Sequence, residues 1–370
     1  MIKHIAVLAV AAVTVIAVAV SSLVPSASAE PFKLKGEANP VWIYYSETND
    51  GGWTQAFDEA RQRVEAELGI KMPYVDKVPE VTSEVKAAVD RLIRRGHNIF
   101  IASAFGYSDA LKELSESYPD VAFLNAAGTT NGPNLQSFFG RTYESQYLCG
   151  VVAGGLTKSK KIGYVAAHPF GLVNWTVNAY LLGARQVSPD VTLHVVYTNS
   201  WNDAVKERVS AVALVEQGVD VIGQHVNSPT PQLVAQENGI FATGFHRDMR
   251  EFAEATQCSS IWVWDRYLTP TLKDIIAGTW DPSSRPYGDF VSIADGGTDV
   301  ACCGDAVPAD IAAKVESERA AFANGKHVFE GPLYDQEGTL RVEEGEVPSD
   351  GDLWGMDWLL QGVVGTTKTL

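Results

Sequence analysis

The sequence is short of cations and, beyond its first residues, of long hydrophobic runs. Its 29 Lys and Arg residues face 45 Asp and Glu residues, which gives a formal net charge of −16. Nucleic acids and anionic membrane surfaces attract basic proteins, so this balance argues against both as partners. No stretch after Val24 has the roughly twenty consecutive apolar residues that a membrane-spanning helix needs.

Cysteine is also scarce. The chain has four, and none belongs to a Cys-x-x-Cys pair or lies beside a His-x-x-x-His pair of the kind that holds zinc, so no metal site is expected. Cys149 lies in a helical run of small residues, which predicts a buried free thiol. Cys258 could form a disulfide with Cys302 or with Cys303 in an oxidising compartment.

Signatures of catalysis are missing as well. The sequence has no Gly-x-Ser-x-Gly nucleophile elbow and no Gly-x-x-x-x-Gly-Lys-Ser/Thr phosphate loop. Gly51 and Gly52 lack the spacing of a dinucleotide-binding loop. A calcium-dependent nucleoside hydrolase would need several Asp residues near the first strand, where only Asp50 stands. We therefore expect a protein that is not an enzyme and binds no cofactor.

The first residues have the pattern of a secretory signal peptide. A short basic start at 1–4 precedes an almost wholly Ala, Val, Ile and Leu run at 5–24, and Ala-Ser-Ala at 27–29 suits signal peptidase. The run is long enough for an uncleaved membrane anchor, which stays the alternative. No Cys follows it, so a lipid anchor is not expected. Removal of residues 1–29 predicts a periplasmic protein.

From about residue 38 onward, short β-rich runs alternate with amphipathic helical patterns, which is typical of α/β proteins with parallel sheets. A strand is expected at 41–45 and a helix at about 53–68. The polar segment 158–161 interrupts the pattern, and a strand at 162–166 starts it again. Two such units in one chain predict two Rossmann-like lobes that face each other across a cleft.

Large aromatic and polar side chains gather in the loops that follow the predicted strands. Ligands of open α/β sheets bind beyond the carboxyl ends of the strands. A flat aromatic ligand needs ring faces on both sides and a few polar groups at its edge, and Trp53 and Trp201 are the candidates for the two faces. Core packing and helix capping are the alternative roles of such residues. The candidate ligand-binding residues are Trp53, Phe105, Tyr107, Trp201, Asp203, His225, Asn227, His246 and Asp248.

Longer motifs carry a family resemblance. They are FGYSD at 105–109, YPDVAF at 118–123, RTYE at 141–144, NSWND at 199–203, QGVDVI at 217–222 and GPLYDQEG at 331–338. Together they resemble the basic membrane protein family, which comprises purine-receptor-like solute-binding proteins of ABC transporters. The resemblance covers about 41–365 and implies a type I periplasmic-binding fold, in which three hinge crossovers join the two lobes.

The resemblance also implies lobe boundaries and partners. The N-terminal lobe would comprise 38–158 plus 260–287, and the C-terminal lobe 159–259 plus 288–370. A small aromatic solute would stack on Trp53 and Trp201, and a monomeric protein would pass it to an ABC permease in the membrane. A ligand-sensing partner of a membrane receptor could use the same cleft and stays an alternative.

Departures from the family pattern point to a free base. Where nucleoside-binding members have an Asp and a Lys for the ribose, this chain has His246 and the pair Val263 and Trp264. Ala126 stands in place of a further acidic residue. We therefore expect an adenine-like nucleobase, with a nucleoside or another small aromatic solute as alternatives. Further aromatic residues that could shape the pocket for another ligand are Phe170, Trp175, Trp262 and Trp264.

Overall fold

The computed structural model describes residues 31–285 and 287–367 of the chain. The expected signal peptide, residues 1–29, lies outside the described residues. None of the helices in the described ranges has the length and apolar character that crossing a bilayer requires.

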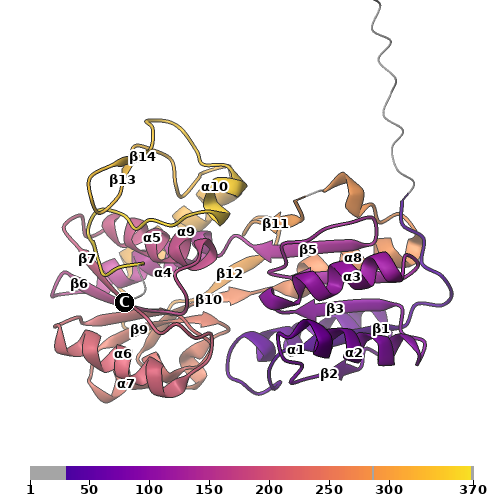
Figure 1. Cartoon of the computed structure of the whole chain (residues 1–370). Helices are drawn as coiled ribbons and strands as arrows, with labels where there is room; N and C mark the ends of the chain where they lie inside the picture. Colours follow the sequence, from indigo (N-terminus) through magenta and orange to yellow (C-terminus); the bar gives the residue numbers. More distant parts are fainter. Residues whose placement is uncertain (1–30, 286, 368–370) are drawn as a thin grey trace, which may run out of the picture. The chain divides into compact units, whose positions relative to one another are not determined.

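The first of the two large sheets contains most of the N-terminal strands, and all of its strand pairs are parallel (Figure 1). In order across the sheet, its strands are β11 (Asp289–Val291), β5 (Leu135–Gly140), β4 (Ala122–Ala126), β3 (Ile99–Ser103), β1 (Pro40–Tyr44) and β2 (Tyr74–Val75). The helical segments that accompany this sheet are α1 (Trp53–Leu68), α2 (Thr82–Ile93), η1 (Phe105–Tyr107), α3 (Ser108–Ser117), α8 (Trp264–Ala277) and η3 (Pro282–Ser284).

The second large sheet is parallel except for β12, which pairs with β10 in the antiparallel direction. In order, its strands are β12 (Thr298–Cys302), β10 (Thr256–Trp262), β9 (Phe241–His246), β8 (Val221–His225), β6 (Lys161–Ala166), β7 (Thr192–Tyr197) and β15 (Val363–Val364). Its helical segments are α4 (Thr142–Leu156), α5 (Gly171–Arg185), α6 (Ala204–Glu216), α7 (Thr230–Glu237), η2 (Met249–Glu251) and α9 (Ala309–Ala323).

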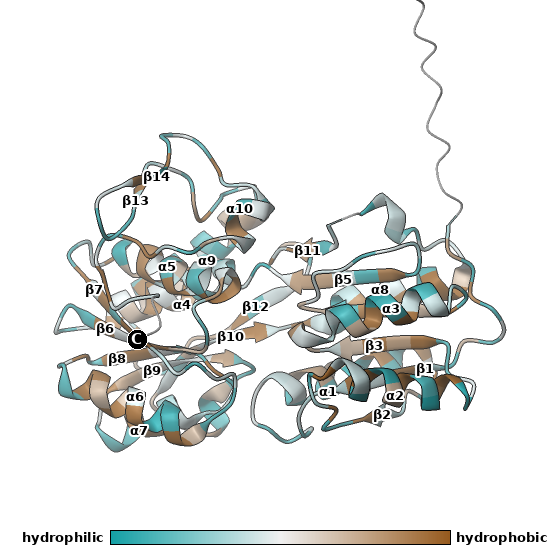
Figure 2. Cartoon of the chain, in the orientation of Figure 1, coloured by the Kyte–Doolittle hydropathy of each residue, from teal (hydrophilic) through white to brown (hydrophobic). Residues whose placement is uncertain are grey.

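The sequence forms these layers because its central strands are apolar on both faces. Every residue of β1, β3, β4, β5 and β8 is buried, as expected for parallel strands covered by helices on either side. The surface helices carry both hydrophobic and hydrophilic residues (Figure 2). In α2, for example, the buried residues are spaced four and three apart and lie on one face: Val85, Val89 and Leu92. The expected α/β fold with two Rossmann-like lobes is confirmed.

Within the described residues, the chain passes between the two sheets three times, after β5, after β10 and after β11. These positions correct the expected lobe boundaries. Helix α4 lies in the range assigned to the N-terminal lobe, but it packs against α5, α9 and β10 of the second sheet. Strand β10 also stays in the second sheet to Trp262, and β11 returns to the first. The crossings therefore lie near residues 141, 263 and 292, rather than at 158, 260 and 287.

Glycines explain why α4 belongs with α5. A Cβ on Gly150 would lie 2.1 Å from the carbonyl oxygen of Tyr180, and one on Gly183 would lie 1.9 Å from the carbonyl oxygen of Tyr147. The two helix backbones thus approach more closely than any side chain would permit. The run of small residues in α4 predicts a helix, but the sequence alone does not show which sheet that helix packs against.

The C-terminal residues extend the second lobe. They form the small sheet β13 (Leu333–Tyr334) and β14 (Leu340–Val342), then α10 (Asp350–Trp354), and β15 joins the second sheet beside β7. At the first crossing, Arg141 makes two hydrogen bonds to the Asp350 carboxylate, of 2.7 and 3.0 Å. Arg141 also lies over the Phe290 ring at 4.3 Å. The C-terminal segment is therefore anchored beside the hinge.

The structure decides the cysteine pairing that the sequence left open. Cys302 and Cys303 form a disulfide with each other, and Cys258 is a free thiol. The bond that Cys258 could have formed with one of these residues is not present, because the two neighbours in sequence pair instead. Cys149 is a buried free thiol, as predicted.

Candidate functional site

A cavity lies where loops at the carboxyl ends of strands from both sheets meet, with about 560 Å³ of space between its atoms, part of which is open to solvent. This is the position at which open α/β sheets bind ligands. Apolar and aromatic side chains make most of its wall, and Glu80 is the one carboxylate among them. The lining residues are Tyr45, Trp53, Glu80, Ala104, Phe105, Ala127, Phe139, Leu172, Trp201, His225, Val226, Asn227, Phe245, His246 and Trp262.

The structure brings most of the expected residues together at this cavity. The candidates that line it are Trp53, Phe105, Trp201, His225, Asn227 and His246. Of the further aromatics, Trp262 lines the cavity, whereas Trp175 and Trp264 are fully buried in the core. Phe170 is 42% exposed and stacks on Phe105 of the other lobe, with ring centroids 6.1 Å apart.

Three expected residues do not line the cavity. The Tyr107 hydroxyl donates a hydrogen bond to the Val78 carbonyl oxygen, at 2.5 Å, and its ring is buried in the core of the first lobe. Asp203 caps helix α6 by accepting from the Lys206 backbone N–H. Asp248 caps η2 in the same way and pairs with Arg250. For both Asp residues, helix capping, the alternative role, is the one that the structure shows.

Several lining residues were missed. Tyr45 directly follows β1, inside the strand that the sequence predicts at 41–45, and Phe139 lies in β5, for which the sequence analysis made no prediction. Glu80 lies in the loop before α2, where the sequence gives no strand-end signal. The chain brings Glu80 to the cavity through the Gly106 N–H, which donates a 2.7 Å hydrogen bond to its carboxylate.

The two tryptophans proposed for stacking come from opposite lobes. The Trp53 indole N–H donates to the Ser103 carbonyl oxygen at 2.8 Å, which fixes the ring at the start of α1. Its ring meets Phe57 and Trp262 edge-on, at centroid distances of 4.8 and 5.3 Å. Trp201 meets His168 edge-on at 4.6 Å. Both indoles are therefore held in place by the rings around them, and both remain half-buried.

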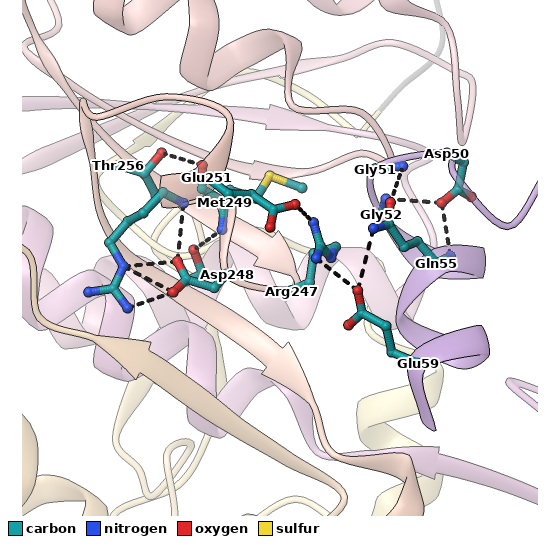
Figure 3. Close-up of polar contacts among 12 residues, drawn as sticks. Asp50, Gly51, Gly52, Gln55, Glu59, Arg247, Asp248, Met249, Glu251 and Thr256 are labelled. Atoms are coloured by element: carbon teal, nitrogen blue, oxygen red, sulfur yellow. Dashed lines mark hydrogen bonds and ion pairs between the residues drawn. The ribbon is translucent and has the colours of Figure 1, made fainter. Parts of the chain in front are cut away.

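Asn227 joins the lobes at the edge of the cavity. Its side-chain oxygen accepts a 2.6 Å hydrogen bond from the Trp53 backbone N–H, and its side-chain nitrogen donates to the Asp50 carboxylate at 2.9 Å. Asp50 also accepts hydrogen bonds from the backbone N–H groups of Gly52 and Gln55, both at 3.0 Å (Figure 3). It therefore satisfies N–H groups at the start of α1 that have no partner within the helix. We call these contacts the Asn227 clasp.

Gly52 makes the Asn227 clasp possible. A Cβ at this position would lie 2.0 Å from the Asn227 carbonyl oxygen, well inside van der Waals contact. Only glycine leaves room for the loop after β8 to close onto the start of α1.

A second contact, the Arg247 clasp, joins the lobes through charge. The Arg247 guanidinium, in the loop after β9, lies 2.8 Å from the Glu59 carboxylate of α1 (Figure 3). Glu251 also pairs with Arg247. The Arg247 side chain is 12% exposed and that of Glu59 is 36% exposed, so water reaches part of this pair.

The two histidines of the cavity are uncharged at neutral pH. Burial lowers the pKa of His225 to about 4 and holds the pKa of His246 well below its usual value. The Trp262 indole N–H donates to His246 Nδ1 at 3.0 Å, so the ring proton of His246 is on Nε2. His225 Nε2 is buried and has no hydrogen-bond partner among the described residues. It is therefore an unused polar atom in the wall of the cavity.

Tyr45 adds a neutral hydroxyl to the same wall. Burial, together with the nearby carboxylates of Asp50 and Glu80, raises the pKa of Tyr45 far above its usual value. Besides the Glu80 carboxylate, the cavity thus presents neutral polar groups between aromatic rings. Among the described residues, no group of three or more His, Cys, Asp or Glu side chains could hold a metal ion.

Comparison with known proteins identifies the family. Residues 39–288 match the family described as ABC transporter substrate-binding protein PnrA-like. A purine-binding protein of Brucella abortus is 32% identical over 87% of this chain and 91% of its own length. A putative ABC transporter glucose-binding protein of Haloferax volcanii is 35% identical over 66% of this chain and 62% of its own length.

Solved structures show the same fold. A solute-binding protein of an ABC transporter system from Conexibacter woesei matches with a TM-score of 0.65 and 20% identity, over 78% of this chain and 97% of its own. A solute-binding protein from Aeropyrum pernix matches with a TM-score of 0.66 and 16% identity, over 78% and 92%. The family and these neighbours are solute-binding proteins rather than enzymes.

Proposed function

Because the chain belongs to the PnrA-like family of ABC transporter substrate-binding proteins, we propose that it captures an adenine-like purine base in this cavity for import. Proteins of this family act outside the cytoplasmic membrane, bind small solutes and work with a membrane permease. The observation that carries the proposal is the wall of aromatic rings drawn from both lobes, with neutral polar groups between them. The purine-binding relative supports the same class of ligand.

The aromatic walls favour a flat ligand. Stacking of a base on an aromatic side chain contributes about 1–3 kcal/mol, and every base has a face for it. Trp53 and Trp201 offer such faces from opposite lobes, so a ligand between them would hold the lobes together. Stacking would supply most of the affinity.

The polar groups would choose among the bases. His225 is neutral and its Nε2 is buried without a partner among the described residues. With the ring proton on Nδ1, Nε2 offers a lone pair that would accept an N–H of the ligand. The Tyr45 hydroxyl can donate or accept. Purine bases carry both N–H groups and ring nitrogen acceptors at their edges, and such groups match this pair. A ligand without an edge N–H would leave His225 Nε2 buried and unpaired.

The free base fits better than its nucleoside. Ribose hydroxyls need several polar partners, and this cavity has Ala127 near the position of the missing acidic residue and Trp262 before the missing Lys. Glu80 is the one carboxylate that could meet a sugar. We therefore propose weaker binding of adenosine than of adenine.

Binding should be measured by calorimetry on residues 30–370, with adenine, guanine, hypoxanthine, adenosine, glucose and benzoate as ligands. We expect adenine or a closely related base to bind most tightly. Trp201→Ala should weaken it roughly thirtyfold, because one stacking face is lost. Tyr334→Ala, at an exposed aromatic residue that does not line the cavity, is the matched control.

Other results would redirect the proposal. If no purine bound but glucose or benzoate did, the proposal of a nucleobase ligand would be rejected. Tighter binding of adenosine than of adenine would favour a nucleoside. We also propose a monomer in the periplasm that delivers its ligand to the permease. If the ligand-loaded protein bound a membrane receptor but no ABC permease, the ligand-sensing alternative would hold.

A further inference from the structure

The four cysteines lie close together, near the place where α4 packs on β10 and β12 of the second sheet. The Sγ atoms of Cys149, in α4, and Cys258, in β10, are 3.5 Å apart, and both residues are fully buried. Cys302, in β12, is bonded to Cys303. Strands β10 and β12 are neighbours, and Cys258 and Cys302 are direct partners in their pairing. The free thiols and the disulfide are therefore adjacent rather than scattered.

Strand alternation shows that Cys258 and Cys302 face the same way. The Ser145 hydroxyl, on α4, contacts the hydroxyls of Ser260 on β10 and Thr298 on β12, at 2.7 and 2.8 Å. Cys258 lies two residues before Ser260, and Cys302 lies four residues after Thr298. Side chains two or four residues apart share a face of a strand, so both cysteines point toward α4.

The spacing of the strands suits a bond between these two residues. Directly opposed residues of an antiparallel pair have Cα atoms about 4.5–5.5 Å apart. Disulfides span Cα separations of about 4.4–6.8 Å. Cys258 is therefore in reach of two sulfur atoms, that of Cys149 above it and that of Cys302 beside it.

Access to solvent differs between the two pairs. Cys302 and Cys303 are half-buried, and β12 forms the edge of its sheet. Cys149 and Cys258 are sealed in the core, where an external thiol or disulfide reagent cannot reach them. Chemistry at the inner pair therefore has to pass through the outer one, unless the core opens.

We propose that the four cysteines form a thiol–disulfide exchange site, with Cys302 and Cys303 as the entrance and Cys149 and Cys258 as the inner pair. The Cys258 thiolate attacks Cys302 Sγ, a bond forms between these residues, and Cys303 leaves as a thiolate. Cys149 then attacks Cys258 Sγ and releases Cys302. Two protons pass from the inner pair to the outer pair, so the exchange needs no outside oxidant. The reduced outer pair can then react with an external disulfide.

Trapping of the intermediate tests the first step. In the Cys149→Ser, Cys303→Ser double variant, only Cys258 and Cys302 remain, and glutathione disulfide should link them in most molecules. The matched control, Cys149→Ser with Cys302→Ser, leaves Cys258 and Cys303, which is one residue further along the chain than the strand partner of Cys258. It should form at least tenfold less linked protein. Alkylation under denaturing conditions and peptide mass spectrometry measure both. Equal linkage in both variants, or none in either, would overturn the proposal.

The rate at which the Cys149–Cys258 disulfide forms tests both exchange steps, in protein that keeps these two cysteines. With glutathione disulfide, the Cys149–Cys258 bond should form in the unmodified protein at least tenfold faster than in the Cys302→Ser, Cys303→Ser double variant. The melting temperature, measured on each, shows whether both are folded. Equal rates, or an unmodified protein in which Cys149 and Cys258 stay alkylatable throughout, would show that the outer pair does not serve the inner one.

Discussion

The two clasps that join the lobes at the cavity differ in physical kind. The Asn227 clasp consists of short, directional hydrogen bonds to Asp50 and to the Trp53 backbone, and it sits against Gly52 with no space for another atom. The Arg247 clasp is an ion pair with Glu59 that water partly reaches. Hydrogen bonds with fixed geometry tolerate little displacement, whereas a partly exposed ion pair is weak and screened by salt.

This difference assigns the clasps separate roles. The Asn227 clasp holds the backbone of a cavity-lining residue, Trp53, so it couples closure of the lobes to the position of one aromatic wall. Neither Arg247 nor Glu59 lines the cavity. We therefore expect the Asn227 clasp to control ligand affinity and the Arg247 clasp to adjust the closed state only slightly.

The largest effect should come from Gly52→Ala. The new methyl group would overlap the Asn227 carbonyl oxygen, which the backbone cannot easily move, so the lobes could not close fully. Overpacking of this kind costs about 3 kcal/mol, which is roughly a hundredfold in Kd for the ligand. Calorimetry gives the affinity, and small-angle scattering reports whether the ligand still compacts the protein.

Gly351→Ala is the control for that substitution, because a Cβ there meets no atom closer than 3.7 Å. It should leave Kd unchanged. Full affinity in Gly52→Ala as well would mean that the ligand-bound form is more open at this point than the structure is.

Asn227→Ala should have an intermediate effect. It removes the hydrogen bonds to Asp50 and Trp53 but adds no atom that blocks closure. Two hydrogen bonds of ordinary strength contribute about 2 kcal/mol, so Kd should rise roughly thirtyfold. Calorimetry measures Kd, and the tryptophan emission of the ligand-bound protein, to which Trp53 contributes among other indoles, should differ between the variant and the unmodified protein. If Asn227→Ala weakened binding more than Gly52→Ala, the contact of Asn227 with the ligand would outweigh its role between the lobes.

Arg247→Ala should have the smallest effect. A partly exposed ion pair contributes at most about 1 kcal/mol, which is roughly fivefold in Kd, and salt screens it. The unmodified protein and the variant should be titrated with ligand at low ionic strength and in 0.5 M salt, where screening extends only about 4–5 Å. Their Kd values should differ at low ionic strength and become equal in 0.5 M salt, a concentration at which the pair is largely screened. Glu59→Gln should reproduce the result from the other side. A salt-independent loss larger than tenfold would show that Arg247 acts on the ligand or on the fold of the loop.

The fold could be predicted well because its signals are local. The alternation of apolar strands and amphipathic helices is set by the burial of each segment, and the strand-end loops that it predicts do surround the cavity. The site could be predicted only in part. Trp53 follows the loop after the first strand and His225 ends β8, so both were found. Glu80 reaches the cavity through its hydrogen bond with the Gly106 N–H, a long-range contact that no periodicity reveals.

The same limit explains why the lobe boundary near α4 differs from the expected one. Helix α4 joins the second sheet because glycines on α4 and α5 face each other, and no property of either helix alone indicates this match. Asp203 and Asp248 have the residue type of both a ligand contact and a helix cap, and their orientation decided for the cap. Residue type was sufficient to name candidate ligand-binding residues, but not to decide which of them contact the cavity and which cap a helix.

The sequence by itself determined the fold class, the twofold α/β plan and the aromatic character of the strand-end loops, because each depends on residues close together in the chain. The tertiary structure decided where the chain crosses between lobes, which aromatic rings form the cavity, and that Cys258 stands between Cys149 and Cys302. These features depend on contacts between residues far apart in the chain, such as that of Trp53 with Asn227, which are 174 positions apart. Their energies arise only when packing brings the partners together, so no local pattern records them.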